Sequence, residues 1–168
     1  MEKMEGSSSG KTSRHGWVNF LLDLPQKAIL FIKENKIFLG ILLLASYLRL
    51  YRISDYMTFL GDEGRDVLVV KGILAGDLTL LGPRASAGDF FTGPIYYYLM
   101  SPFLWLFNYD PVGPAIMIAL LGIATVFLIY ILGKRIFGIN AALVAALLYT
   151  ISPVVISYSR SSWNPNPM

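Results

Sequence analysis

Residues 111–132 read PVGPAIMIALLGIATVFLIYIL and contain no charged side chain. A helix of about 20 apolar residues matches the thickness of the hydrocarbon layer of a bilayer. Lys134 and Arg135 follow directly, and basic residues beside a span are typical of its cytoplasmic end. The stretch therefore predicts a membrane-spanning helix and an all-α integral membrane fold.

The composition of the chain agrees with a membrane protein. Of its 168 residues, 55% are hydrophobic and 15% are charged, against about a quarter charged in ordinary soluble domains. The absence of cysteine excludes disulfides and thiolate metal sites. The single histidine, His15, lies in a polar tail, and we expect it to bind no metal. Basic residues are scattered or flank apolar segments, so nucleic-acid binding is not expected.

Three spans are predicted, at residues 37–51, 111–132 and 139–158. The first is short, but Arg49 and Arg52 can reach to the far interface, and residues upstream of Ile37 can extend the helix. The last two spans are joined by a short turn at 136–138, and Pro153 lies near the outer end of the third span.

A long outer loop, residues 52–109, is predicted between the first two spans. Its residues 94–107 are apolar and aromatic but too short for an ordinary crossing. Their aromatic content suits the membrane interface, so we expect a juxtamembrane or re-entrant helix, with a genuine span as the alternative. A fourth crossing would put Lys134 outside, against the usual charge bias, so three crossings fit better.

The N-terminal part is predicted to lie on the cytoplasmic side. Residues 1–16 are polar and rich in Ser and Gly, which is typical of a disordered tail. In residues 17–36, apolar side chains recur at steps of three and four beside lysines, which predicts an amphipathic helix on the anionic membrane surface.

Three carboxylates, Asp62, Glu63 and Asp66, lie close together in the outer loop. One interpretation is capping, because carboxylates in a first helical turn satisfy free N–H groups. The other is that a carboxylate at the membrane edge acts as a general base on a polar substrate. Carboxylates this close in sequence could also hold a divalent cation, but they more often cap a helix. No metal site and no cofactor are predicted.

Several short motifs occur in an order that points to a known family. They are Leu48–Arg52 (LRLYR), Asp62-Glu63, Gly93–Leu99 (GPIYYYL), Gly133–Gly138 (GKRIFG), Ser152-Pro153 and Tyr158-Ser159-Arg160. In this order they resemble the N-terminal part of GT-C-fold glycosyltransferases of the family 39 type. Protein O-mannosyltransferases and the aminoarabinose transferases that modify lipid A are members of that group. The resemblance covers roughly residues 36–168.

The resemblance implies that residues 37–168 are part of a larger transmembrane domain, incomplete and inactive alone. It implies transfer of a sugar from a polyprenyl-phosphate carrier lipid to a protein, lipid or glycan acceptor on the extracytoplasmic side. Asp62 falls on the catalytic base of the family, and Glu63 would support it or contact the acceptor. Arg160 and Arg84 are the candidate partners of the donor phosphate. The aminoarabinose transferases have a basic residue before the Pro of the loop motif, where this chain has Thr92-Gly93.

Other interpretations of these residues remain open. Tyr96 and Tyr98 are candidates for stacking on a sugar or prenyl chain, although an interfacial aromatic belt also explains them. Arg160 could instead be an interfacial anchor, and Asp66 is expected to contribute much less than Asp62.

The alternative function is a segment of a transporter or flippase, with Asp62 and Glu63 as coupling residues. A third is a scaffold without catalysis. A cluster that follows the end of a span, rather than lying at the midplane, favours the transferase.

Overall fold

The computed structural model describes residues 35–84 and 90–165. The predicted tail 1–16 lies outside these ranges, as does the predicted amphipathic segment 17–36 except for Asn35 and Lys36. The chain divides into two compact units, Met1–Leu39 and Gly40–Met168. Of the first unit, only the beginning of one helix is described. The candidate site lies entirely in the second unit.

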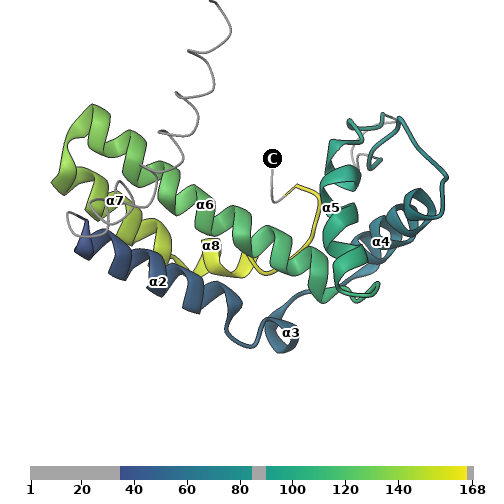
Figure 1. The fold of residues 1–168 in the computed structure, drawn as a ribbon, viewed down its shortest axis with the longest axis horizontal. Helices are drawn as coiled ribbons and strands as arrows, with labels where there is room; N and C mark the ends of the chain where they lie inside the picture. Colours follow the sequence, from purple (N-terminus) through teal and green to yellow (C-terminus); the bar gives the residue numbers. More distant parts are fainter. Residues whose placement is uncertain (1–34, 85–89, 166–168) are drawn as a thin grey trace, which may run out of the picture. The chain divides into compact units, whose positions relative to one another are not determined.

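The described residues form helices. In chain order these are α2 (Lys36–Leu50), α3 (Ile53–Tyr56), α4 (Gly61–Leu74), α5 (Ile95–Leu106), α6 (Val112–Phe137), α7 (Ile139–Ile151) and α8 (Pro153–Tyr158), as Figure 1 shows. No β-strand occurs in residues 35–84 or 90–165; Arg84 and Phe91 form an isolated antiparallel bridge. The predicted all-α class is therefore confirmed.

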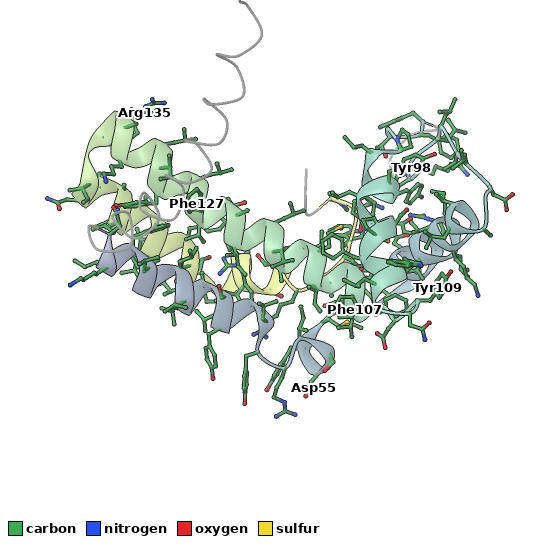
Figure 2. All side chains as sticks on the ribbon, in the orientation of Figure 1. Asp55, Tyr98, Phe107, Tyr109, Phe127 and Arg135 are labelled. Atoms are coloured by element: carbon green, nitrogen blue, oxygen red, sulfur yellow. The ribbon has the colours of Figure 1, made fainter. Side chains whose placement is uncertain are left out.

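Helix α6 is the membrane-span candidate in the part of the chain that the structure describes. It is long and apolar enough to cross a bilayer, whereas α7 is apolar but shorter. It runs past the predicted end at Leu132, through Lys134 and Arg135, and stops before Gly138 (Figure 2). Gly138 has a φ of 86°, a left-handed value that glycine adopts without steric cost, so the helix ends there. The count of three spans stays a prediction.

The predicted span 139–158 consists of two helices, and its crossing of the membrane stays a prediction. It divides into α7 and α8 at Ser152, whose φ of −62° and ψ of 117° are extended. The cause is Pro153. Its ring lacks an N–H and disfavours helical geometry at the preceding residue. Pro153 instead begins α8, where the missing N–H costs nothing.

Helices α4, α5 and α6 share one hydrophobic core. Its buried members are Val70, Ile73, Tyr96, Tyr97, Met100, Leu104, Met117 and Ile118. Helix α3 contacts α6 separately, through Ile53 against Ala115 and Ala119. This packing fixes the second half of α4 against α5 through Val70 and Ile73, and so positions the helix that carries the site.

The side chain of Arg49 is buried rather than extended to an interface. Its exposed fraction is 0%, and its guanidinium donates to the carbonyls of Ala45 at 3.3 Å and Tyr149 at 3.5 Å. A Cβ on Gly122 of α6 would lie 2.9 Å from Arg49 Nε and 2.8 Å from Ser159 Oγ. The prediction that Arg49 reaches the interface is therefore wrong, because close packing around Gly122 encloses it among helices of the second unit.

Candidate functional site

The acidic cluster begins helix α4, as its composition predicts. Asp62 and Glu63 both lie in the first turn of the helix. Glu63 Oε2 accepts the backbone N–H of Leu60 at 3.1 Å, which is the back-reaching half of a capping box. Its other oxygen, Oε1, accepts from the hydroxyl of Ser161 at 3.0 Å. Glu63 is 2% exposed, so capping is its evident structural role.

Asp62 is the accessible carboxylate of the three. Its side chain is 45% exposed, whereas Glu63 and Asp66 are buried. Oδ1 of Asp62 accepts from Nη1 of Arg65 at 3.2 Å, and Oδ2 accepts from Nε1 of Trp163 at 3.3 Å. Both oxygens are thus oriented by donors while the carboxylate still reaches solvent. This is the combination that a proton acceptor for a bound substrate needs.

Asp66 lies one turn further along α4 and is fully buried, with 0% of its surface exposed. Oδ1 accepts from Arg65 Nη2 at 3.1 Å and from the Tyr97 hydroxyl at 3.1 Å, and Oδ2 accepts from Asn164 Nδ2 at 3.2 Å. Burying a carboxylate is costly unless it is hydrogen-bonded, and these donors satisfy it. Asp66 is therefore an internal connection between α4, α5 and the chain near residue 164.

Four consecutive residues near the end of the described chain, the 161–164 segment, each contact this region. Ser161, Trp163 and Asn164 donate to Glu63, Asp62 and Asp66 respectively, and the Ser162 carbonyl accepts from the Tyr96 hydroxyl. Every carboxylate of the cluster thus has one oxygen bonded to the 161–164 segment. Only the Asp62 contact leaves its carboxylate open to solvent.

A cavity of about 500 Å³ opens beside Asp62. Its lining residues are Thr58, Leu60, Gly61, Asp62, Glu63, Ser157, Tyr158, Ser161 and Trp163. The lining combines a carboxylate, several hydroxyl groups and the rings of Tyr158 and Trp163. Polar groups among apolar walls are typical of a small-molecule site, and the volume falls within the usual range for one.

The three tyrosines at the start of α5 point in two directions. Tyr96 and Tyr97 turn their hydroxyl groups toward Ser162 and Asp66. Tyr98, labelled in Figure 2, donates instead to the Thr79 carbonyl at 2.9 Å. Burial first, and then the negative charge of Asp66, raises the pKa of Tyr97 to about 12 and also raises the pKa of Tyr96. The predicted substrate contacts of Tyr96 and Tyr98 stay predictions.

Arg160 and Arg84, the predicted phosphate partners, do not line the cavity beside Asp62. The Arg160 guanidinium lies 5.2 Å from the ring centroid of Tyr56, and Nη2 donates to the carbonyl of Leu48. Arg160 Nε is buried and has no hydrogen-bond partner among the described residues. Arg84 lies on the surface at the bridge with Phe91. Their assignment to a phosphate stays a prediction.

Asp62, Glu63 and Asp66 do not converge on one point. Each makes its own set of hydrogen bonds, and no three acidic or histidine side chains of residues 35–84 and 90–165 form a group able to hold a metal ion.

Comparison with known proteins shows that part of the chain is similar to sugar transferases. Residues 92–168 match the dolichyl-phosphate-mannose-protein mannosyltransferase family. A stretch of 69 residues is 32% identical to a protein of Bacillus subtilis (strain 168) described as "Putative mannosyltransferase YycA". The resemblance inferred from the sequence motifs is confirmed at this level. No solved structure matches the chain.

The matched stretch is a small part of a larger relative. It covers 41% of this chain and 10% of the Bacillus protein. The family match begins after α4 and includes the 161–164 segment together with Tyr96 and Tyr97. The matched part therefore supplies the donors that come from Tyr97 and the 161–164 segment, whereas the carboxylates and Arg65 precede it.

Sequence reasoning missed the role of three residues in this region. Tyr97, Trp163 and Asn164 all donate to the carboxylates, yet they are separated from them by 31, 101 and 98 positions respectively. No periodicity or local spacing reports such contacts. The available signal was chemical: a Trp and an Asn among serines, directly after a predicted span.

Proposed function

We propose that this chain is part of a membrane glycosyltransferase that moves a sugar from a polyprenyl-phosphate donor to a hydroxyl acceptor on the extracytoplasmic side. The observation that carries the proposal is the position of Asp62. Its carboxylate is oriented by Arg65 and Trp163, remains 45% exposed, and lines the cavity of about 500 Å³. The family match over residues 92–168 supports the same chemistry.

In the proposed reaction Asp62 takes the proton of the acceptor hydroxyl. The acceptor oxygen forms a bond to the anomeric carbon of the sugar as the bond from that carbon to the carrier phosphate breaks. The electron pair leaves with the polyprenyl phosphate, and the proton stays on Asp62 until solvent removes it. A positioned general base contributes about a hundredfold to ten-thousandfold to such a rate.

Glu63 supports the base by holding the helix start in place. It caps Leu60 on one side and accepts from Ser161 on the other, so the backbone that carries Asp62 is fixed on both sides. Asp62 itself projects from a first helical turn, where free N–H groups favour negative charge. These contacts hold the Asp62 carboxylate in a fixed position beside the cavity.

The departing phosphate requires cationic or N–H partners. We assign this role to Arg160, with Arg84 as a further candidate. Arg160 directly precedes Ser161, which lines the cavity, and its buried Nε has no partner among the described residues. An unsatisfied buried donor is costly, so a phosphate oxygen at that atom would be favourable.

The proposal is tested by Asp62→Asn in the complete protein, with radiolabelled dolichyl-phosphate mannose as donor and the endogenous membrane acceptors. The amide keeps the shape and most of the capping ability but cannot take a proton. We expect normal insertion and folding with a large loss of transfer. Asp55→Asn is the matched control, because Asp55 is an exposed carboxylate of the same predicted outer loop, paired with Arg52 at 2.6 Å.

A further inference from the structure

The most buried member of the acidic cluster has no role in the base chemistry proposed above. Asp66 is fully enclosed, whereas the neighbouring Asp62 is open. A buried carboxylate is retained at a cost that its hydrogen bonds must offset. Its partners are Arg65 on the same helix, Tyr97 on α5, and Asn164 in the 161–164 segment. Asp66 is thus bonded to three separate parts of the chain.

Two of the contacts of the 161–164 segment fall on one face of α4. Asp62 and Asp66 are four residues apart, which places them one above the other on a helix surface. Trp163 donates to the first and Asn164 to the second, at 3.3 Å and 3.2 Å. Because these donors are adjacent residues, the Asn164 bond helps to fix where the Trp163 indole lies relative to Asp62.

Trp163 is also part of the cavity wall. Its indole lines the cavity of about 500 Å³ together with Asp62, and it is 38% exposed. An exposed indole held by one hydrogen bond would be mobile without support from the neighbouring chain. Asn164, bonded to the buried Asp66 at 3.2 Å, holds the chain directly after it. Ser161, which accepts the Trp163 backbone N–H at 3.4 Å and donates to Glu63 at 3.0 Å, holds the chain before it.

We propose that Asp66 is a positioning residue: through Asn164 it holds the 161–164 segment on α4, and through Trp163 it sets the orientation of the Asp62 carboxylate. The inference rests on the proposed function, in which Asp62 is the base. It reverses the expectation from sequence that Asp66 contributes little. Arg65 takes part from the other side, since the same guanidinium contacts both Asp62 and Asp66.

The test compares Asp66→Asn and Trp163→Phe in the complete protein, assayed with radiolabelled dolichyl-phosphate mannose. Asp66→Asn keeps the side-chain size but removes the negative charge and replaces one acceptor oxygen with an amide N–H. Trp163→Phe keeps an aromatic ring but removes the indole N–H that donates to Asp62. We expect kcat to fall about tenfold to a hundredfold in both, because a misplacement of about 1 Å has that effect, while the KM for the donor stays close to normal. Asp77→Asn, an exposed carboxylate beyond the far end of α4, should leave both constants unchanged.

Two further variants separate positioning from simple stability. In an Asp62→Asn background, Asp66→Asn should cause no further loss, because the group it positions is already absent. The double variant Asp66→Asn/Asn164→Asp should recover most of the kcat that Asp66→Asn loses. In it the amide and the carboxylate have exchanged positions and can still form a hydrogen bond. A merely structural role would give equal losses in both backgrounds, in step with a lower melting temperature, and would overturn the inference.

The outcomes distinguish this inference from the proposed function. Full activity of Asp66→Asn beside an inactive Asp62→Asn removes the positioning role alone. Full activity of Asp62→Asn removes the base assignment, and the positioning role with it.

Discussion

Trp163 donates from its indole Nε1 to Oδ2 of Asp62 across 3.3 Å, although the two residues are 101 positions apart in the sequence. The contact joins the first turn of α4 to a segment within the part of the chain that matches the mannosyltransferase family. A carboxylate held by an indole N–H and a guanidinium has a defined orientation, which is the first requirement of a general base.

Gly122 should be sensitive to the smallest possible substitution. In Gly122→Ala the new Cβ would lie 2.9 Å from Arg49 Nε and 2.8 Å from Ser159 Oγ, closer than van der Waals contact. Overpacking of this kind typically costs about 1–3 kcal/mol. We expect a lower melting temperature of the detergent-purified complete protein. Gly40→Ala is the control, since nothing lies within 4 Å of its added Cβ; equal melting temperatures for the two variants would contradict the packing described for Arg49.

Tyr97 should make folding stability depend on alkaline pH. Burial raises its pKa to about 12 from an ordinary value near 10, so the folded protein retains the phenolic proton where the unfolded chain has lost it. The resulting stabilisation is present in full below about pH 10 and is lost as pH rises through about 12. Melting temperatures between pH 9 and 12 measure the effect. Tyr97→Phe should weaken this dependence, and an unchanged pH profile in that variant would exclude Tyr97 as its source.

Arg160 should control the use of the donor if it contacts the carrier phosphate. Arg160→Lys keeps the charge but loses the planar donor geometry of the guanidinium. We expect the KM for the labelled donor to rise about tenfold or more, as for the loss of a hydrogen bond to a charged group, with little change in the amount of folded protein. Arg52→Ala, at an exposed position, is the control. Unchanged donor dependence in Arg160→Ala would reduce Arg160 to an anchor.

The predicted topology has a direct chemical test, because the chain contains no cysteine. Leu80→Cys and Lys134→Cys should react with a membrane-impermeant maleimide from opposite sides, position 80 from outside and position 134 from the cytoplasm. Leu80 is 88% exposed, so its replacement should be reached readily. Reaction of both from the same side would mean that residues 94–107 cross the membrane.

Sequence patterns predicted the features that depend on neighbouring residues. The helix start at Asp62, the helix over 94–107 and the long apolar helix after Pro111 all follow from local composition, and the structure has them at Gly61–Leu74, Ile95–Leu106 and Val112–Phe137. The division of the last predicted span also has a local cause, in Pro153. The apolar run alone favours one continuous helix over these residues, and Pro153 divides it into two.

Features that depend on distant contacts were not predictable in this way. Arg49 lies beside the end of an apolar run and reads as an interfacial anchor, but its burial depends on Gly122 and Tyr149 in other helices. The sequence suggests that Asp66 helps to cap the start of a helix, yet its side chain accepts hydrogen bonds from Tyr97 and Asn164. Both roles arise from tertiary packing, which hydrophobic periodicity does not encode.

The central claim is that Asp62 takes a proton during sugar transfer, and Asp62→Asn in the complete protein tests it most directly. The measurement is the rate of mannose transfer from the labelled donor at saturating concentration, together with donor binding and melting temperature. We predict unchanged binding, a melting temperature within a few degrees of the parent protein, and a rate lower by at least about a hundredfold. A near-normal rate in Asp62→Asn would contradict the account, because an amide cannot accept the proton.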